Sequence, residues 1–329
     1  MLGKLFFIIF IYIASTFLAP VVQSYDFEDG FNRSYLSGWL EENIYPTYDM
    51  SEIQEVNSEQ TQEVAINLGT QYEVEDQEVL ESEYAGQFVV ENDYGMFRMV
   101  LINDGKVTGA YTNSDDVSID TINMEGMDRE SVREIYGEPV ESIKKGWKRL
   151  RVTNEEYEVY DLKDRYVYFF YDLHDSEKVN GVLMLSKDEI RETETLYNHP
   201  PTEDNSRMNH LLINATRYEY GFNPLEVDQQ AADAALGHSE DMAERDYFNH
   251  DSPDGETLKD RIEAADVSYR MAGENIAMGH TSTIFSHHSL MNSLDHRVNT
   301  LKPEFTHLGV GTAYNDDDIP YYTENYVYR

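Results

Sequence analysis

Apolar and aromatic positions in the first half of the chain follow strand-like patterns. Two runs, 94–102 and 166–171, are dense in Tyr, Phe, Met and Val, residue types that favour strands. Each run is followed by a polar turn and then by the motif Lys-Val-x-Gly, at 106–109 and at 178–181. The shared motif indicates two related hairpins.

A helix is expected between the two hairpins. Asp128 is a suitable N-cap for a helix over 129–136, and Gly137, followed closely by a proline, is a suitable C-cap. The segment therefore predicts an α+β domain over 65–190, which ends at a linker over 191–204 where two adjacent prolines block a helix. No set of residues in this domain converges as a catalytic site would, so a structural or recognition role is favoured.

Helical spacing dominates the rest of the chain, which we predict to be a second domain over 205–329. Apolar residues recur there every three or four positions, and four helices are expected. The expected helices cover 208–218, 228–245, a short segment capped by Thr257, and 284 to near 295. Two strands follow, 308–314 and 321–326, joined by a solvated acidic turn at 316–318. Helices followed by strands again indicate an α+β domain.

The N-terminus has the features of an export segment. Lys4 precedes an apolar run over 5–22, and a small-residue cleavage motif ends at Ser24. The run is also long enough to span a membrane, so residues 1–24 are predicted to be a signal peptide or a membrane anchor. Residues 25–64 are polar and acidic without a sustained period, which predicts an acidic flexible tether. The protein is therefore expected to be exported, and either secreted or anchored at the outer face of the cell membrane.

Charge and cysteine content exclude several classes of function. The chain has 63 acidic and 25 basic residues, a formal net charge of −38. A field of this sign repels nucleic acid and anionic membrane surfaces, so a membrane contact is expected only through the N-terminal segment. The absence of cysteine removes disulfides, thiol nucleophiles and thiolate metal ligands.

Most histidines of the chain are concentrated in the second predicted domain. Eight of the ten lie between His210 and His307, and two of these stand in short polar strings near a glutamate. The strings are Phe-Asn-His-Asp-Ser-Pro at 248–253, Gly-Glu-Asn-Ile at 273–276, and Ser-Leu-Asp-His-Arg-Val-Asn at 293–299. If folding brings His250, Glu274 and His296 together, two imidazoles and a carboxylate form one site.

These strings resemble the motifs of the CAP (SCP/TAPS) superfamily, which includes cysteine-rich secretory proteins, insect antigen 5 and plant pathogenesis-related proteins of class 1. The resembling segments are 238–243 with 248–255, 273–276, and 292–299 with 308–311, in the order of the family. In the first domain, 133–139 is similar to the CAP-associated N-terminal domain of Bacillus-type bacterial proteins. The resemblance implies a CAP α-β-α sandwich, preceded by a smaller α+β accessory domain, in an exported bacterial protein.

The same resemblance implies a candidate site. The central cleft of the family commonly holds two histidines and two acidic residues, and His250, Glu274 and His296 match three of these positions. The fourth position, an acid in the animal branch, is Ser293 here. Two imidazoles and a carboxylate can bind Zn²⁺ or another divalent cation. Without a metal, Glu274 can act as a base toward water, or the three side chains can pin loops through hydrogen bonds.

Two functions therefore stay open. One is a binding module for a lipid, a glycan or a peptide, and the family resemblance favours it over an enzyme. The other is a peptidase-like hydrolase that acts on envelope or extracellular substrates, with a metal or with Glu274 and the histidines. A serine hydrolase that uses Ser252 or Ser293 has no nucleophile-elbow sequence in its support.

The other histidines of this region are not expected to form the site. His238 shares an apolar stripe with Ala235 and Met242, which favours a hydrogen-bonded core histidine. His287 and His288 are predicted to lie on a helix surface, and the remaining histidines are also expected at the surface. The many tyrosines are expected to pack against the sheets.

Overall fold

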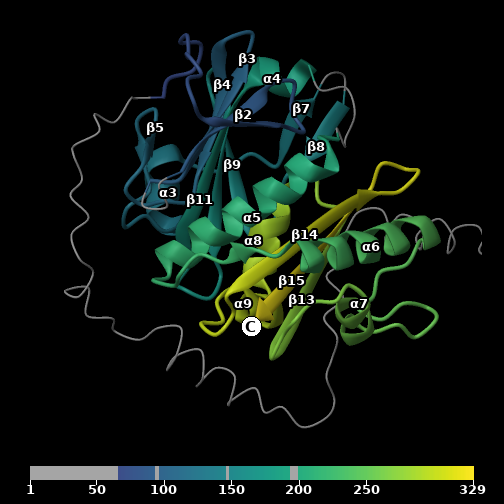
Figure 1. The fold of residues 1–329 in the computed structure, drawn as a ribbon. Helices are drawn as coiled ribbons and strands as arrows, with labels where there is room; N and C mark the ends of the chain where they lie inside the picture. Colours follow the sequence, from purple (N-terminus) through teal and green to yellow (C-terminus); the bar gives the residue numbers. More distant parts are fainter. Residues whose placement is uncertain (1–65, 93–95, 146–147, 193–198) are drawn as a thin grey trace, which may run out of the picture.

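Two β-sheets and the helices packed on them form the described part of the chain (Figure 1). The computed structural model describes residues 66–92, 96–145, 148–192 and 199–329. The predicted export segment and tether, residues 1–64, lie outside the described residues. Within the described ranges, no helix is both long enough and apolar enough to cross a membrane. The mixture of helices and strands confirms the α+β class.

The first sheet is antiparallel and has seven strands in the order β1-β2-β3-β4-β11-β10-β9. Its strands are β1 (Glu78–Glu81), β2 (Gln87–Glu91), β3 (Arg98–Asn103), β4 (Lys106–Thr112), β9 (Tyr157–Leu162), β10 (Arg165–Asp172) and β11 (Lys178–Ser186). Two short ribbons accompany it, β5 (Ser118–Ile119) with β6 (Ile122–Asn123), and β7 (Ser142–Lys145) with β8 (Lys148–Arg151). The helices of this part are α3 (Arg129–Tyr136) and α4 (Lys187–Glu192).

The two predicted hairpins are confirmed, and they lie side by side because β4 pairs with β11. Each hairpin contains a bulge within its Lys-Val-x-Gly motif. The register runs Leu101–Gly109 then Ile102–Val107 in the first hairpin, and Phe170–Gly181 then Tyr171–Val179 in the second. Thr108 and Asn180, which occupy position x, are thus the extra residues of the two bulges. The Lys-Val-x-Gly motif thus occurs twice because each of the two hairpins has a bulge at the same place.

Helix α3 begins and ends where the sequence predicts. The Asp128 carboxylate accepts a hydrogen bond from the backbone N–H of Ser131, and the Ser131 hydroxyl accepts one from the Asp128 backbone N–H. Gly137 has a φ of 82°, a conformation that glycine adopts without strain, and its N–H donates to the Arg133 carbonyl. These caps depend on neighbouring residues only, which is why the sequence is sufficient to place them.

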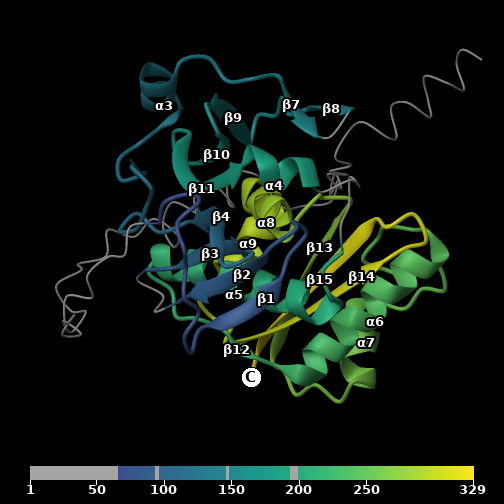
Figure 2. The same cartoon turned by 90° about the horizontal axis from the view of Figure 1, so that it is seen from above.

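The second sheet has four strands in the order β12-β14-β15-β13. Its strands are β12 (Glu226–Val227), β13 (Met271–Met278), β14 (His307–Tyr314) and β15 (Pro320–Tyr328), and its helices are α5 (Thr202–Glu219), α6 (Gln229–Arg245), α7 (Leu258–Ala264), α8 (Thr283–Asn292) and α9 (Leu294–Thr300). Helices α6 and α7 cover one face, and α5, α8 and α9 cover the other (Figure 2). This is the α-β-α sandwich that the resemblance implies.

Alternation along the strands separates the two faces of this sheet. Val327 packs with Ala231 of α6 and Ile262 of α7, whereas the adjacent Tyr326 packs with Ile213 of α5. On β14, Gly309 faces the other way from its neighbours, and a Cβ at Gly309 would lie 2.1 Å from a backbone nitrogen of α6. A side chain here would displace α6, so glycine allows the helix to lie directly on the strand.

One predicted helix is divided in two. The expected helix from 284 to near 295 ends at Asn292 as α8, and α9 begins at Leu294. Ser293 between them is extended, with φ −98° and ψ 116°. The break turns the chain so that α8 packs against the first sheet while α9 packs beside β13. The apolar spacing of the sequence contains no mark of this break.

Helices α5 and α8 lie between the two sheets and belong to a core that both halves of the chain share (Figure 1). Met208 and Leu211 of α5 and Ile284 of α8 pack in one cluster with Phe170 and Leu183 of the first sheet. The two sheets are therefore joined through a continuous apolar layer rather than through an open gap.

The prediction that His287 and His288 lie on a helix surface is wrong, because α5 covers His287 and the first sheet covers His288. Both side chains are buried. His288 stacks on Phe170 with ring centroids 4.0 Å apart, and its Nε2 lies 2.9 Å from the hydroxyl of Tyr111. His287 Nε2 lies 2.7 Å from the hydroxyl of Thr216. His210, also expected at the surface, is buried on α5.

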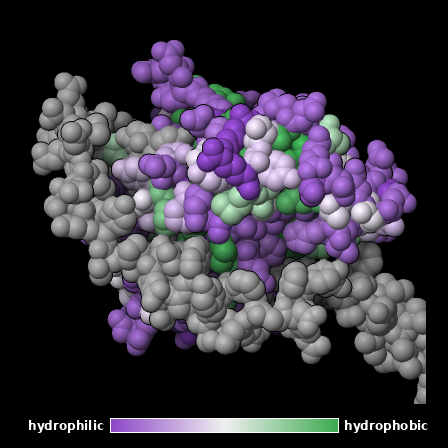
Figure 3. Space-filling model, turned by 60° about the horizontal axis from the view of Figure 1, so that its bottom comes forward, coloured by the Kyte–Doolittle hydropathy of each residue, from purple (hydrophilic) through white to green (hydrophobic). Residues whose placement is uncertain are grey.

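Tyrosines pack on both sheets, as expected from the sequence. Tyr111, Tyr160 and Tyr171 are fully buried on the first sheet, and Tyr322 and Tyr326 are fully buried on the second. The face of the molecule that Figure 3 shows is mainly hydrophilic. The hydrophobic residues on it form small groups that are separated by hydrophilic ones. This is consistent with the acidic composition.

Candidate functional site

The candidate site combines one loop, one strand and one short helix of the second half of the chain. His250 lies in the loop between α6 and α7, Glu274 lies on β13, and His296 lies on α9. The structure brings His250 and Glu274 into direct contact, with 2.8 Å between Nδ1 and Oε1. His296 is close enough to His250 for the charge of His250 to affect its pKa. We call His250, Glu274 and His296 the His/Glu cluster.

Glu274 is the buried centre of this cluster. Burial of its side chain raises the pKa, but the hydrogen bond from His250 and the charge of Arg261 outweigh burial and hold the pKa below the ordinary value. Arg261 Nη2 lies 2.7 Å from the second carboxylate oxygen, Oε2. Both oxygens of Glu274 are therefore engaged, and the carboxylate is ionised at neutral pH.

Arg261 is a residue of the site that sequence reasoning missed. It lies on α7, which begins at a capping box between Thr257 and Asp260. The predicted cap at Thr257 is confirmed, and it fixes the first turn from which Arg261 extends toward β13. The sequence marks the helix start, but no pattern distinguishes this arginine from others in short helices.

His238 is a core histidine, as predicted, and it supports the loop that carries His250. The side chain is buried on α6, and its Nε2–H donates to the carbonyl oxygen of Asn249 over 3.0 Å. Burial lowers its pKa. A neutral imidazole on α6 thus holds the residue immediately before His250.

His296 and Ser293 form a second contact of the site. Their Nδ1 and Oγ atoms are 2.7 Å apart, and burial together with the charge of His250 lowers the pKa of His296 to about 4. His296 is therefore neutral at pH 7. Ser252, the other serine considered as a nucleophile, is buried in a turn where its Oγ accepts a hydrogen bond from the Glu256 N–H.

A polar network below the cluster fixes its two backbone positions. Asn275 Nδ2 donates to the carbonyl of His296 and to Glu324, and Asn299 Nδ2 donates to the carbonyl of Glu274. Glu324 is fully buried and accepts further hydrogen bonds from Asn209 and Tyr326. This network links β13, α9 and β15, and it was not predicted because its members look like ordinary polar residues.

The cluster does not form a ready metal centre in this arrangement. Within the part of the chain that the structure describes, no three histidine, aspartate or glutamate side chains are placed to hold one metal ion. Both oxygens of Glu274 already contact a donor, and one of these donors is the Arg261 guanidinium, a cation that competes with a metal for the carboxylate. No step of chemistry is therefore assigned to a metal here.

Family models match both halves of the chain. The model described as the cysteine-rich secretory protein family matches residues 211–326, and the CAP-associated N-terminal model matches residues 54–196. Two Bacillus subtilis (strain 168) relatives match over a shorter length. The uncharacterized membrane protein YlbC is 42% identical over 36% of this chain, and the uncharacterized protein YkwD is 41% identical over 30% of it. The matches span only 33% and 39% of these two relatives.

Solved structures resemble most of the described fold. An extracellular protein containing an SCP domain from Bacillus anthracis is 27% identical, with a TM-score of 0.66, and the match covers 77% of this chain and 88% of the other. A cysteine-rich secretory protein from Staphylococcus aureus is 18% identical, with a TM-score of 0.62 over the same shares of the two chains. The second likeness concerns the fold alone.

Proposed function

Because this chain belongs to the CAP superfamily, in its bacterial form, we propose that it is an exported protein that binds a polar extracellular ligand through the His/Glu cluster. Export is supported by the apolar N-terminal run and by the extracellular description of the Bacillus anthracis neighbour. A glycan or a peptide fits the cluster better than a lipid, because the imidazoles of the cluster and the Ser293 hydroxyl beside His296 form hydrogen bonds.

The observation that carries this proposal is the exposure of His250 beside a buried carboxylate. The His250 side chain is 44% exposed, whereas that of Glu274 is 2% exposed. Since Nδ1 of His250 donates to Glu274, its Nε2 is the nitrogen left to meet a ligand. An imidazole that is fixed at one nitrogen and open at the other is a preorganised hydrogen-bonding group.

Hydrolysis is a second candidate, which the contact between Glu274 and His250 favours. A carboxylate that orients an imidazole is a recurring arrangement in general acid–base catalysis. In this version Glu274 positions His250, and Nε2 of His250 takes a proton from water. Glu274 is not itself the base, because both of its oxygens are engaged.

Titration calorimetry of the full chain with soluble muropeptides, which contain both glycan and peptide, tests the binding proposal. We expect saturable binding that weakens about tenfold or more in His250→Ala, since a ligand hydrogen bond is lost. His307→Ala is the matched control, because it removes an imidazole at the start of β14, outside the cluster. Equal weakening in the two variants, or no binding by the native chain, would overturn the proposal.

Turnover and metal dependence separate the alternatives. The binding proposal expects intact muropeptides after long incubation and the same affinity with EDTA as with added Zn²⁺. Cleavage that disappears in His250→Ala would establish the hydrolase instead. An affinity that requires Zn²⁺ would show that a metal completes the cluster.

A further inference from the structure

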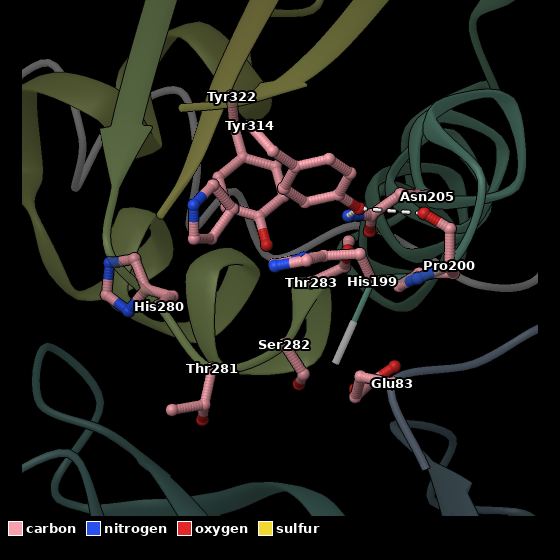
Figure 4. Close-up of a pocket in the computed structure, with 11 residues that line it drawn as sticks. Glu83, His199, Pro200, Asn205, His280, Thr281, Ser282, Thr283, Tyr314 and Tyr322 are labelled. Atoms are coloured by element: carbon pink, nitrogen blue, oxygen red, sulfur yellow. Dashed lines mark hydrogen bonds between the residues drawn. The ribbon is translucent and has the colours of Figure 1, made fainter. Parts of the chain in front are cut away.

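A second polar hollow lies away from the His/Glu cluster, where the first sheet, the segment before α5 and the far end of the second sheet meet (Figure 4). The empty space within it and across its open mouth, solvent included, is about 220 Å³. The residues that matter for its chemistry are Glu83, His199, His280, Thr283, Tyr314 and Tyr322. Thr281 at its rim is exposed, so the hollow is open to solvent.

Glu83 supplies a buried carboxyl group to this hollow. The residue lies between β1 and β2 and is 7% exposed, and its Oε1 accepts no hydrogen bond from the described residues. Burial raises the pKa of Glu83 to about 7, against smaller opposing effects of the Ser282 hydroxyl and Lys145. Among the described side chains, none forms an ion pair with Glu83. A buried carboxylate without a cation beside it raises the free energy of the folded protein. A cation bound in the hollow would therefore be stabilised by Glu83.

The imidazoles of the hollow do not supply a positive charge to Glu83. Burial lowers the pKa of His280 to about 4, and burial also lowers the pKa of His199. Both rings are therefore largely neutral at pH 7. The nearby cation is Lys145 on β7, which is not among the residues that line the hollow.

Two tyrosine rings form a fixed aromatic wall. Figure 4 shows Tyr314 and Tyr322 together on one side of the hollow, with Glu83 and Ser282 on the other side. The Tyr314 hydroxyl accepts a hydrogen bond from Asn205 over 2.8 Å and donates to the Pro200 carbonyl over 3.0 Å. The wall is thus set before any ligand arrives, and an aromatic face attracts cations.

A buried hydroxyl adds a further unused polar group. Thr283, the first residue of α8, is 1% exposed; its hydroxyl lies beside that of Tyr322, and its Oγ1 accepts no hydrogen bond from the described residues. The hollow thus combines a carboxyl oxygen and a hydroxyl oxygen that accept no hydrogen bond from the described residues with two aromatic faces. An ammonium group matches all three, since it carries charge and three N–H donors.

We propose that this hollow binds the ammonium group of a small extracellular amine. Glu83 forms the charge-assisted hydrogen bond, Thr283 Oγ1 accepts a second one, and the tyrosine rings pack against the aliphatic carbons next to the nitrogen. The net charge of −38 concentrates cations around the protein and supports their entry. This proposal does not depend on the function proposed for the His/Glu cluster.

Butylammonium titrated into the full chain, followed by calorimetry at pH 8, tests the proposal. We expect saturable binding that weakens about tenfold to a hundredfold in Glu83→Gln, because a charge-assisted hydrogen bond is lost. Glu81→Gln is the matched control: Glu81 is exposed on β1, and its loss changes the net charge equally without touching the hollow. Equal weakening in both variants would reduce the effect to general charge and overturn the proposal.

The choice of ligands separates an amine site from other sites. Glucosamine and lysine amide carry the same ammonium group on a sugar and on an amino acid. The ligand that binds with the higher affinity identifies the source of the group. Butanol lacks the charge and should not compete. Displacement of butylammonium by equimolar K⁺ would identify a site for inorganic cations and overturn the proposal. The His250→Ala variant should bind butylammonium unchanged, which keeps this test separate from the His/Glu cluster.

The pH dependence gives a test that needs no variant. Binding requires ionised Glu83, so affinity should rise from pH 6 to pH 8 and level off above, while the amine stays protonated throughout. The other titratable groups near Glu83 are Lys145, the imidazoles of His199 and His280, and the phenols of Tyr84, Tyr314 and Tyr322. Burial lowers the pKa of both imidazoles and raises the pKa of the phenols, so none of these rings acquires a charge as the pH rises from 6 to 8. An affinity that is flat from pH 6 to pH 8 in the native chain would contradict the role of Glu83.

Discussion

Two regions of this molecule contain the same set of groups, two histidines and an arginine–carboxylate pair, in opposite environments. At the first region, the His/Glu cluster together with Arg261, the arginine pairs with Glu274 and one imidazole is exposed. At the junction between the two sheets, which we define by Asp172, His287, His288 and Arg297, every member is buried. The residue types are alike, so only their surroundings decide between a ligand site and a structural joint.

The difference lies in what completes the hydrogen bonds. At the junction, Arg297 meets both oxygens of Asp172, at 2.7 and 3.3 Å, and each imidazole meets a hydroxyl from another helix or strand. The partners found there all come from the chain itself, and the other ring nitrogen of His288, Nδ1, is buried without a partner among the described residues. In the cluster, His250 has one nitrogen on Glu274 and a side chain 44% exposed, so part of its bonding capacity is left for an outside molecule. We take this open capacity as the mark of a binding site.

The largest expected effect is the loss of the buried pair at the junction. Arg297→Ala leaves the Asp172 carboxylate buried with Tyr220 as its remaining side-chain donor, and should cost about 3–5 kcal/mol of the free energy of unfolding. Urea denaturation, with the midpoint and slope both fitted, measures this loss.

An exposed arginine provides the control for this prediction. Arg191 pairs with Asp188 at the surface, and Arg191→Ala should change the free energy of unfolding by less than about 1 kcal/mol. If Arg297→Ala cost no more than Arg191→Ala, the two sheets would not be joined by this pair, and the comparison between junction and cluster would fail.

A smaller effect is expected from a histidine of the junction and should depend on pH. Burial and the charge of His287 hold the pKa of His288 well below its ordinary value of 6.5, so the folded protein keeps this ring neutral while the unfolded chain takes up a proton. The contribution of His288 is therefore complete above pH 6.5 and is lost as the pH falls. Between pH 7 and pH 5 the loss amounts to about 2 kcal/mol.

His288→Gln tests this dependence, because glutamine can reach Tyr111 but does not titrate. The variant should be less stable than the native chain at pH 7, since the stacking on Phe170 is lost. The gap between the two proteins should narrow by about 2 kcal/mol at pH 5. A gap that is constant with pH would mean that His288 is accessible to protons in the folded protein.

The sequence was sufficient to predict those parts of the structure that depend on residues close together along the chain. The caps of α3 at Asp128 and Gly137, and the cap of α7 at Thr257, follow from residues three or four positions away. The Lys-Val-x-Gly repeat predicted two related hairpins, because the bulge that it encodes is a local feature. His250 and Glu274 were found from short strings that the family shares, although no spacing rule shows that they touch.

The sequence was not sufficient where structure depends on the other half of the chain. His288 looks like a surface residue of a helix until the first sheet covers it, and so does His287 until α5 packs beside it. Gly181 illustrates the reason: a Cβ there would lie 2.6 Å from the His288 ring, so a glycine more than a hundred residues away makes room for it. The role of Arg261 and the hollow around Glu83 were not predicted for the same reason. The contact of Arg261 with Glu274 and the lining of the hollow both join segments that are distant in sequence.

The smallest effect on stability is expected in the cluster, and it sharpens the comparison most. His250→Ala should change the free energy of unfolding at pH 7 by less than about 1 kcal/mol, because this side chain is 44% exposed. The pKa of Glu274 should nevertheless rise, since burial is then opposed mainly by Arg261. Glu274 is stabilising above its unfolded pKa and loses this contribution as the pH falls, so acid unfolding of the variant should begin at a higher pH.

Carbon-detected NMR titration of the Glu274 carboxyl, beside acid denaturation, measures both quantities in the native chain, in His250→Ala and in the control His307→Ala. The control should leave the Glu274 pKa unchanged, because His307 lies outside the cluster at the start of β14. If the Glu274 pKa were unchanged in His250→Ala as well, the side chains of His250 and Glu274 would not be in contact in solution. His250 would then not be oriented by Glu274, as the proposed function requires. A rise in pKa with little loss of stability is the combination that a structural joint such as the junction cannot give, because every partner there is buried.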